Sequence, residues 1–541
     1  MTSFAHIDIA IILGYFALVV GIGFLYAARN RGTLETSLGY FLGNRRLGWV
    51  AIGASLFATN ISSEHFVGLA GNGARRGLAV GNFEWMAIIF LMMLGWIFAP
   101  VLIRSKVFTV PEFFGRRFNP ASRLYLAGIS IFAYVLTKSA VSLFAGGLLM
   151  EQVFGWDIYT SGIVMLMVTG MYTVAGGLGA VVYTSVVQAV FLVVGAVLMT
   201  LVGLDAVGGW SGLQAALPED FFHLFKPATD PEFPWTGILF GAPILGIWYW
   251  CTDQYIVQRV LSARSVEAAR YGTVLTGFLK ILPMFVLVIP GLIAAVLFPD
   301  LVGKEAYSML LSSSLLPAGV KGLVIAGVLA ALMSSLAATF NSAATLVTMD
   351  VYRHFRPAAS ERNLVLVGRL STVVMVLIGI ILIPLTRYMS AHIYVNMQSL
   401  QAVISPPIAA VFLVGFFWKR INGTGAIWAL VLGGLIGLAR LTVGVFDIDG
   451  AAIGGPLGTL IDLNFLHFAI WHFVASTAIL VGVSLASAAP SPAALGGMTH
   501  AASSRFSAAG GWHAALADNR QMLVYSALLL IVLAGLMGRF I

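Results

Sequence analysis

The chain has 541 residues, of which 59% are hydrophobic and only 10% are charged. A soluble globular protein carries about a quarter charged residues, so this composition indicates a membrane protein with many spans and excludes a set of soluble domains. The net charge of +8 comes from basic residues in the loops between apolar spans, which is a pattern of membrane orientation and does not indicate nucleic-acid binding. The one cysteine, Cys251, excludes an internal disulfide.

Apolar runs of roughly 20 residues, the length that crosses a bilayer, predict fourteen transmembrane helices. Their approximate ranges are 6–28, 48–73, 79–104, 123–152, 158–176, 178–204, 235–258, 271–297, 314–349, 363–385, 392–418, 423–443, 465–487 and 521–540. With the N-terminus outside, the cytoplasmic loops hold nineteen of the 30 lysines and arginines, and the opposite side holds seven. Because positive charge gathers on the cytoplasmic side, we expect a multi-pass protein of the plasma (inner) membrane with both termini outside the cytoplasm.

Two of these spans contain residues that interrupt a helix. The second contains, after an apolar start, the polar run ATNISSEHFVGLAG (58–71), and lipid offers such groups no hydrogen bonds, so we expect a broken helix near 58–66. The seventh contains GAPILGIWYWCTDQY (241–255), and we expect its break near 241–250. If helices 2–6 and 7–11 form two five-helix repeats, both breaks fall in the first helix of a repeat, which points to a transport site at the membrane midplane. The alternative is an ordinary kink with an aromatic belt.

The charged residues that fall inside predicted spans include Glu84, Lys138 and Lys280. A charge in the bilayer centre costs roughly 2.5–3.5 kcal/mol or more, so such a residue faces a cavity or the interior of the bundle. Each is therefore a candidate site residue. The alternative for any one of them is a place at a helix end, where the side chain reaches the interface.

The ninth span holds a run of small and polar residues, AALMSSLAATFNSAATLVT (330–348). Ser334 and Ser335 follow Ala331 by three and four residues and share its helix face. Hydroxyl and carbonyl oxygens without a carboxylate suit a monovalent cation better than Ca²⁺ or Mg²⁺. On spacing alone, however, close packing of helices is the better interpretation of these small residues.

Four long motifs resemble the sodium/solute symporter family, and most of all its sodium/glucose cotransporter branch. They are ASLFATNISSEHFVGLAGNGARRGLAVGNFEW (54–85), YWCTDQYIVQRVLSARS (249–265), KGLVIAGVLAALMSSLAATFNSAATLVTMDVY (321–352) and SPPIAAVFLVGFFWKRINGTGA (405–426). The likeness runs over roughly 40–440. It implies an all-α polytopic membrane protein with a LeuT-type core of two inverted five-helix repeats, among about 14 transmembrane helices.

The resemblance divides the chain into five parts. They are an extra helix and first cytoplasmic loop (1–46), a first repeat (47–204), an extracellular loop (205–234), a second repeat (235–418), and C-terminal helices (419–541) with a linker at 488–520.

The resemblance also implies site residues. For sodium, the ligands would be the carbonyl groups of Ala58, Ile61 and Ala331 and the hydroxyl groups of Ser334 and Ser335, in agreement with the donor types above. The implied solute-binding residues are Asn60, His65, Glu84, Tyr249, Trp250, Lys280 and Gln398. The implied outer-gate residues are Leu69, Phe83 and Tyr394.

These side chains suit a hexose, because they donate to and accept from hydroxyl groups and offer an aromatic face to the C–H surface of a sugar. The expected function is sodium-coupled import of a glucose- or galactose-like monosaccharide, with sodium as the coupling ion and no other cofactor. Two departures matter. Gly246 stands where bacterial sodium/galactose transporters of the family have an asparagine, which counts against galactose, and Ser185 stands where many relatives have an aspartate, which favours one sodium per solute.

Several alternatives stay open at this point. A sodium-coupled symporter of the same kind could carry myo-inositol or another polyol. A carboxylate such as sialate or proline is less favoured, because an ionised Glu84 would repel it. A sensor that binds a solute without transporting it is an alternative of another functional class. A channel is a further alternative, but the sequence has no recognisable selectivity filter. An enzyme is not expected, because no nucleophile–base pair is evident.

Overall fold

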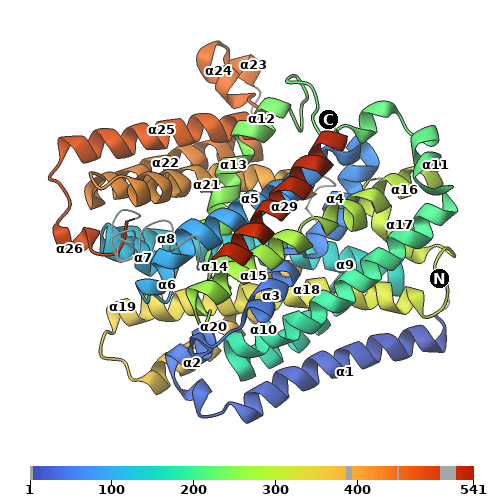
Figure 1. Ribbon diagram of the computed structural model, residues 1–541, viewed down its shortest axis with the longest axis horizontal. Coiled ribbons are helices and arrows are strands. Elements are labelled where there is room, and N and C mark those ends of the chain that lie inside the picture. Colours follow the sequence, from blue (N-terminus) through green and yellow to red (C-terminus); the bar gives the residue numbers. More distant parts are fainter. Residues whose placement is uncertain (1–3, 302, 385–392, 447–449, 500–518, 541) are drawn as a thin grey trace.

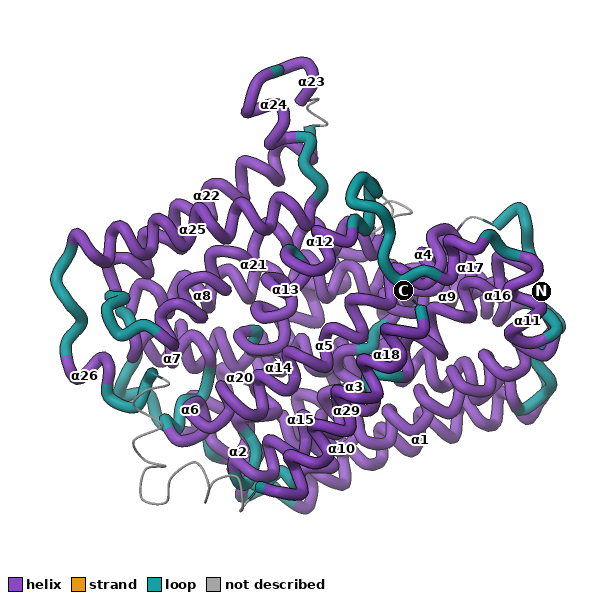
Figure 2. The backbone as a smooth tube through the Cα atoms, turned by 45° about the horizontal axis from the view of Figure 1, so that its top comes forward, coloured by secondary structure: helices purple, strands orange, loops and turns teal. Residues whose placement is uncertain are grey.

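The computed structural model of the protein describes residues 4–301, 303–384, 393–446, 450–499 and 519–540. The regular structure of these residues is helical, and the described part of the chain has no strand beyond isolated bridges (Figures 1 and 2). The helices of the first half are α1 (His6–Arg29), α2 (Ser37–Leu42), α3 (Trp49–Asn60), α4 (Ser63–Arg76), α5 (Asn82–Met93), α6 (Ala99–Arg104), α7 (Val110–Arg117), α8 (Pro120–Ala133), α9 (Ala140–Phe154), α10 (Ile158–Ala206), α11 (Gly209–Ala216), α12 (Trp235–Phe240), α13 (Ala242–Ile247) and α14 (Gln254–Leu261). Those of the second half are α15 (Val266–Leu279), α16 (Ile289–Leu297), α17 (Ala306–Ser312), α18 (Val320–Thr345), α19 (Arg353–Phe355), α20 (Glu361–Leu382), α21 (Ile393–Phe417), α22 (Gly423–Val445), α23 (Gly450–Ile453), α24 (Gly455–Ile461), α25 (Phe465–Ala486), α26 (Pro492–Leu495) and α29 (Arg520–Arg539).

Within the described residues, 10 helical segments are long and apolar enough to cross a membrane. A helical protein that crosses a membrane many times is therefore confirmed. The expected count of fourteen is not, and it stays a prediction, because several expected spans do not form one uninterrupted helix. One of them is divided into α3 and α4, whereas two others join in α10.

The two legs of α10 meet at Gly177, whose φ of +55° lies outside the helical region. A Cβ at this position would lie 2.4 Å from the carbonyl oxygen of Tyr40. Only glycine meets both demands, the left-handed backbone and the close approach of α2. This residue marks the boundary between the predicted spans 158–176 and 178–204.

The first interruption lies where it is expected, between α3 and α4. Ile61 and Ser62 have extended backbones, with φ/ψ of −76°/118° and −129°/−178°. The Ser62 N–H would bond the Ala58 carbonyl in a continuous helix, but here it donates to Nδ1 of His65 over 3.3 Å. The interruption therefore releases carbonyl groups at the end of α3.

The second interruption is more gradual and extends beyond the expected range of 241–250. Pro243 lies in the first turn of α13, where its missing N–H breaks no helical bond, so this stretch bends the chain without unwinding it. A π-helical turn then covers Trp248–Thr252, and the first residue with an extended backbone is Asp253 (φ −73°, ψ 123°).

The helix α18 forms the centre of the protein, with almost every residue buried. It packs along α10, and both pack against α1 (Figure 1). The last long helix, α29, lies across α15 and α5. The helices α21, α22 and α25 pack against one another and form a separate group.

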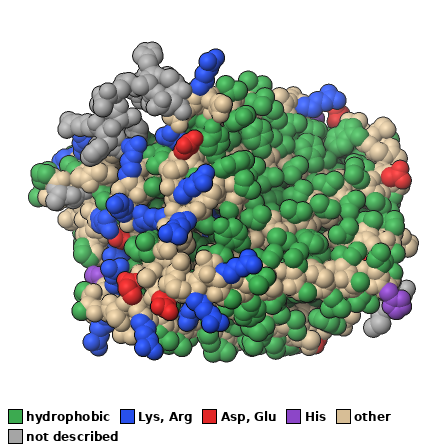
Figure 3. All heavy atoms as spheres, turned by 60° about the horizontal axis from the view of Figure 1, so that its bottom comes forward, with side chains coloured by type: hydrophobic (Ala, Val, Ile, Leu, Met, Phe, Trp, Pro, Cys, Tyr) green, Lys and Arg blue, Asp and Glu red, His purple; other side chains and the backbone are tan. Residues whose placement is uncertain are grey.

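The outer surface of the bundle is suited to lipid. Figure 3 shows one face on which hydrophobic side chains form a broad area, while lysine and arginine side chains gather toward one end. The exposed apolar residues of α1 and α20 include Leu13 (62%), Leu25 (56%) and Ile381 (70%). Figure 2 shows the short helices α23 and α24 projecting from the bundle.

Candidate functional site

A cavity lies between the two interrupted helices and is closed by α5 and α21. About 580 Å³ of space free of atoms lies within it when the open solvent at its mouth is counted, and about 60 Å³ of this can hold the centre of a water-sized sphere. Its lining consists of Asn60, Glu64, His65, Phe83, Glu84, Met86, Phe90, Lys138, Ala242, Leu245, Gly246, Tyr249, Trp250, Met397, Gln398 and Gln401. Six of the seven residues expected to bind solute are in this lining, and the seventh, Lys280, contacts two of them.

Lys280 holds the polar side of the cavity together. It caps the end of α15 and is fully buried, and its Nζ donates both to Oε2 of Glu84 and to Oδ1 of Asn60. Asn60 in turn donates from Nδ2 to the hydroxyl of Tyr249 over 3.0 Å. A buried charge needs a partner with good hydrogen bonds, and this network supplies one for both Glu84 and Lys280.

His65 joins this network from the first turn of α4. Its Nδ1 accepts from the Ser62 N–H, which leaves the proton of a neutral imidazole on Nε2. That Nε2 lies 3.5 Å from Oε1 of Glu84. The broken helix therefore positions His65 against the same carboxylate that binds Lys280.

Two aromatic side chains from the π-helical turn form another wall. The rings of Tyr249 and Trp250 are 5.2 Å apart and nearly perpendicular. Two lysines approach these rings as cations: Nζ of Lys138 lies 4.3 Å from the Tyr249 centroid, and Nζ of Lys280 lies 5.4 Å from the Trp250 centroid. The π-helical turn shifts these side chains by one residue relative to an α-helix, a common feature of functional sites.

The residues expected to bind sodium lie where α3 ends against α18. All five are buried: Ala58, Ile61, Ala331, Ser334 and Ser335. Tyr255 of α14 connects the two helices, because its hydroxyl is 2.6 Å from the Thr59 carbonyl oxygen and 2.8 Å from Oγ of Ser335. Next to it on α18, Oγ of Ser334 lies 3.0 Å from Oγ of Ser185.

The three expected gate residues are placed differently. Phe83 lines the cavity and packs edge-on against Phe233, with centroids 6.1 Å apart. Leu69 is fully buried in α4 and is not part of the lining. Tyr394 belongs to α21, but its side chain lies outside the part of the chain that the structure describes.

The lining also contains residues that the sequence did not assign. Gln401 follows Gln398 by three residues on the same face of α21, so helical spacing could have identified it. Lys138 was a candidate site residue as a charge within a span but was not among the implied solute-binding residues, and Glu64 belongs to the polar run of the first interruption. Phe90 carried no signal: a Cβ at Gly246 would lie 2.1 Å from its ring, so Phe90 fills the space in which a larger side chain would stand.

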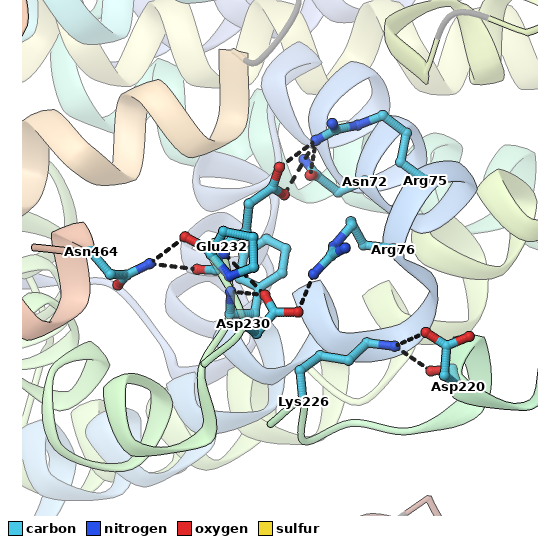
Figure 4. Close-up of polar contacts among 10 residues, drawn as sticks. Asn72, Arg75, Arg76, Asp220, Lys226, Asp230, Glu232 and Asn464 are labelled. Carbon is cyan, nitrogen blue, oxygen red and sulfur yellow. Dashed lines mark hydrogen bonds and ion pairs between the residues drawn. The ribbon is translucent and has the colours of Figure 1, made fainter. Parts of the chain in front are cut away.

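A second polar cluster lies at the far end of α4, away from the cavity (Figure 4). Arg75 donates to Oδ1 of Asn72 over 3.0 Å and to both carboxylate oxygens of Glu232 over 3.3 Å. Arg76 forms an ion pair with Asp230. These bonds fasten the end of α4 to the predicted extracellular loop 205–234.

The same loop is anchored at further points (Figure 4). Asn464 at the start of α25 donates to the carbonyl groups of Pro231 and Glu232, over 2.7 and 3.3 Å. Burial raises the pKa of Asp230, but the N–H groups of Phe233 and Glu232 and the Arg76 guanidinium stabilise the carboxylate, so that its pKa is lowered overall. The loop is thus attached to both α4 and α25.

The sequence was compared with known protein families and proteins. The profile of the Sodium:solute symporter family matches residues 40–433. The chain is 40% identical over 523 residues to the sodium/glucose cotransporter 1 of Oryctolagus cuniculus, which covers 88% of this chain and 78% of that protein. It is 39% identical over 521 residues to the sodium/glucose cotransporter 4 of Danio rerio (89% and 79% covered). A sodium/myo-inositol cotransporter 2 of Oryctolagus cuniculus is 38% identical over 522 residues (90% and 77%).

Solved structures share the fold. A Na⁺-coupled sialic acid symporter in a substrate-bound outward-open state aligns with a TM-score of 0.77 over 90% of this chain and 99% of that one. The two chains are 22% identical, so the likeness concerns the fold alone. A nucleobase-cation-symport-1 family transporter aligns with a TM-score of 0.52 and 14% identity. Both neighbours are transporters of the LeuT-type fold.

Proposed function

Since the chain belongs to the sodium:solute symporter family, with sodium as its coupling ion, we propose that it imports a monosaccharide of the glucose or galactose type. The observation that carries this proposal is the network that joins Glu84, Lys280, Asn60 and His65 around one cavity. Each polar side chain in it can accept from or donate to a hydroxyl group.

The electrostatics of the cavity favour a neutral solute. The charges of Glu84 and Lys280 compensate each other through a direct hydrogen bond, so neither needs an ionic cargo. Glu64 adds a further carboxylate to the lining, and its Oε2 has no hydrogen-bond partner within the described residues. A solute carboxylate would meet that charge, whereas a sugar hydroxyl could donate to it.

The aromatic side of the cavity fits a sugar as well. The faces of Tyr249 and Trp250 can cover the C–H surface of a pyranose ring. Phe90 replaces, at the Gly246 position, the polar contact expected of a galactose-selective site. We therefore propose that glucose is carried at least as well as galactose.

For the coupling ion, we propose the ligand set that the resemblance implies: the carbonyl groups of Ala58, Ile61 and Ala331 and the hydroxyl groups of Ser334 and Ser335. The released carbonyl groups at the end of α3 support this site, as does the contact of α3 with α18. Ser185 lies beside Ser334 as a hydroxyl and brings no carboxylate for a second cation, which supports one sodium per solute.

Transport would follow from this arrangement by alternating access. Sodium holds the end of α3 against α18 and thereby organises Asn60 and the first turn of α4 for the solute, and the coupling is reciprocal. Two inverted repeats, 47–204 and 235–418, then rock around the fixed site. One sodium that moves inward down 100 mV contributes about 2.3 kcal/mol before its concentration gradient is counted.

The membrane arrangement belongs to the same proposal. It comprises about 14 spans in the plasma (inner) membrane, with both chain termini and loop 205–234 outside the cytoplasm. The gathering of basic side chains toward one end of the face in Figure 3 supports the orientation, because positive charge marks the cytoplasmic side.

A second candidate cargo is myo-inositol. Relatives named as sodium/myo-inositol cotransporters are 38% and 37% identical to this chain, close to the values for the glucose cotransporters. A cyclic polyol would use the same donors and acceptors as a hexose.

Uptake into proteoliposomes under an inward sodium gradient separates these possibilities. Labelled glucose, galactose and myo-inositol are compared in parallel, each with excess unlabelled competitor. We expect glucose to accumulate and galactose to compete with equal or lower affinity. Accumulation of inositol alone would replace the cargo, and binding of a sugar without accumulation would replace the transporter by a sensor.

A further inference from the structure

Two serine hydroxyls of α18, those of Ser334 and Ser335, each lie within hydrogen-bond distance of another hydroxyl group. Oγ of Ser335 lies 2.8 Å from the hydroxyl of Tyr255, and Oγ of Ser334 lies 3.0 Å from Oγ of Ser185. All four side chains are at most 1% exposed. Water therefore does not compete for these contacts, and the hydrogen of each hydroxyl has a defined place.

The neighbouring carbonyl groups fix the direction of both hydrogen bonds. A carbonyl oxygen only accepts, so Tyr255 must donate its hydrogen to Thr59, 2.6 Å away. A hydroxyl has one hydrogen, and Ser335 is therefore the donor to Tyr255.

The same logic holds for the neighbouring Ser334. Ser185 donates to the Val181 carbonyl over 2.7 Å, and so Ser334 must be the donor to Ser185. Both serines thus give their hydrogen to a neighbour and keep their lone pairs.

A hydroxyl that binds a cation must offer lone pairs and turn its hydrogen elsewhere. We propose that Tyr255 and Ser185 are positioning residues of the sodium site: they take the hydrogens of Ser335 and Ser334 and keep both oxygens ready for the ion. This inference rests on the proposed sodium ligands and adds two residues that contact those ligands without contacting the ion.

Tyr255 has a second consequence for the interruption in the first helix. Ile61 and Ser62 leave the helix, which releases the Thr59 carbonyl from its intrahelical bond. Tyr255 occupies this carbonyl and so directs the ion toward the other released oxygens. Its own N–H is held by the Tyr134 hydroxyl over 2.9 Å, which fixes the start of α14.

Tyr255 also lies between the ion ligands and the solute cavity. Its ring centroid is 6.4 Å from that of Tyr249, which lines the cavity, and Nζ of Lys138 lies over both rings. The hydroxyl end of Tyr255 faces the ion ligands, whereas the ring faces the solute side. Removal of the hydroxyl alone should therefore affect sodium far more than solute.

Tyr255→Phe tests this assignment, because it deletes the hydroxyl and keeps the ring. In proteoliposomes, we expect the sodium concentration for half-maximal uptake to rise about tenfold, the effect of one lost buried hydrogen bond to a ligand. At saturating sodium, the solute KM and the maximal rate should stay within about twofold of the wild type. A merely structural role would instead lower the maximal rate and leave the sodium dependence unchanged.

The matched control is Tyr307→Phe. Tyr307 is as buried as Tyr255, and its hydroxyl has no hydrogen-bond partner within the described residues. Its removal should leave the sodium dependence unchanged.

A second pair of variants keeps the test decisive if Tyr255→Phe does not fold. Ser185→Ala removes the acceptor of the Ser334 hydrogen, and we expect it to raise the sodium concentration for half-maximal uptake several-fold. Thr184→Val is its control, since the Thr184 hydroxyl donates to carbonyl groups of its own helix.

The second readout is the melting temperature of the purified protein against sodium concentration, with potassium at constant ionic strength. A ligand that binds the folded state raises it, so it reports sodium binding without transport. A wild type that shows neither sodium-dependent uptake nor sodium-dependent stabilisation would remove the proposed function. A wild type that responds to sodium, with Tyr255→Phe and Ser185→Ala responding at the same concentration, would overturn the positioning role alone.

Discussion

The two interrupted helices differ in the hydrogen-bond partners of the backbone groups that each break releases. At Asp253, the second interruption is bonded partly within its own segment: the Asp253 N–H donates to the Trp248 carbonyl over 3.0 Å, and its carboxylate accepts from the N–H of Tyr255 over 3.1 Å, which also donates to the Tyr134 hydroxyl. At Ile61 and Ser62, the first interruption borrows partners from elsewhere, with Tyr255 on the Thr59 carbonyl. The first break supplies the released carbonyl groups that are proposed to bind the ion, whereas the second places aromatic side chains against the cavity.

This difference assigns the two helices different parts of the proposed mechanism. The second interruption presents Tyr249 and Trp250 to the cavity, and its Trp248 carbonyl accepts from the Thr252 hydroxyl and the Asp253 N–H. The first contributes both the carbonyl groups for sodium and, on either side of the break, Asn60 and His65 for the solute. Ion and solute are therefore linked through a few residues of one chain segment.

The largest expected effect comes from the buried ion pair of Lys280 and Glu84, in which Lys280 also bonds Asn60 at the first interruption. Lys280→Met leaves Glu84 buried without its cation, and loss of one partner of such a pair costs about 3–5 kcal/mol. We expect uptake to fall at least about 100-fold, measured as initial rate per folded protein.

The control for this variant is Lys226→Met. Lys226 also forms an ion pair, but its partner Asp220 is 67% exposed and can return to water. An equal loss of uptake in both variants would contradict the role of the buried pair.

Asp253→Ala removes hydrogen bonds that hold the second interruption in place. It removes the acceptor of the Tyr255 N–H and of the Tyr134 hydroxyl, and loss of a helix cap costs about 1–2 kcal/mol. We expect a lower melting temperature together with a changed sodium dependence, because the Tyr255 N–H loses one of its two partners and the other, Tyr134, loses its own acceptor.

Ser265→Ala is the matched cap deletion in an uninterrupted helix, since Ser265 caps α15 by accepting from the Ala268 N–H over 3.0 Å. It should lower the melting temperature and leave the sodium dependence unchanged. If both variants alter only stability, the second interruption does not contribute to coupling.

Tyr249→Phe removes a hydrogen bond that joins the two interruptions on the side of the cavity, from Asn60 Nδ2 to the Tyr249 hydroxyl. Such a bond contributes about 0.5–1.5 kcal/mol. We expect the solute KM to rise about three- to tenfold and the sodium dependence to change less. A rise in the sodium concentration for half-maximal uptake with an unchanged solute KM would contradict the assignment of Tyr249 to solute binding.

The smallest effect is expected at the outer end of α4, where Arg76 pairs with Asp230. An ion pair that is partly exposed contributes up to about 1 kcal/mol. The pKa of Asp230 is lowered from 3.8, so its contribution is present above that value and is lost as the pH falls through the folded-state pKa.

The melting temperatures of the wild type and of Asp230→Asn should therefore differ slightly at neutral pH and converge in acid, below about pH 4. A difference that grows as the pH falls would contradict the ion pair.

The sequence predicted well the features that depend on local chemistry. Asn60, His65 and Glu84 stood out because polar groups in a span need partners, and the structure brings all three to one cavity. Lys280 was predicted for the same reason and joins them by hydrogen bonds.

The features that depend on packing between distant segments escaped prediction. Phe90 fills the space beside Gly246 through a contact between α5 and α13, and an apolar residue in a span gives no signal of that kind. Tyr255 looks like one more aromatic residue, and its role rests on Thr59 and Ser335, which are 196 and 80 residues away in the chain. The end of the second interruption was placed too early because Gly241 and Pro243 draw attention, although a proline in a first turn does not unwind a helix.

The central claim is that an ion held between α3 and α18 drives the uptake of a sugar. Its most direct test compares glucose accumulation in proteoliposomes with inward sodium or potassium gradients for the wild type, Ser335→Ala and Ser342→Ala. Ser342 is another buried serine of α18, and it donates to Gln258 away from the proposed ligands. We predict accumulation with sodium only, lost in Ser335→Ala and kept in Ser342→Ala. Accumulation that is independent of sodium, or equal in the two variants, would contradict the account.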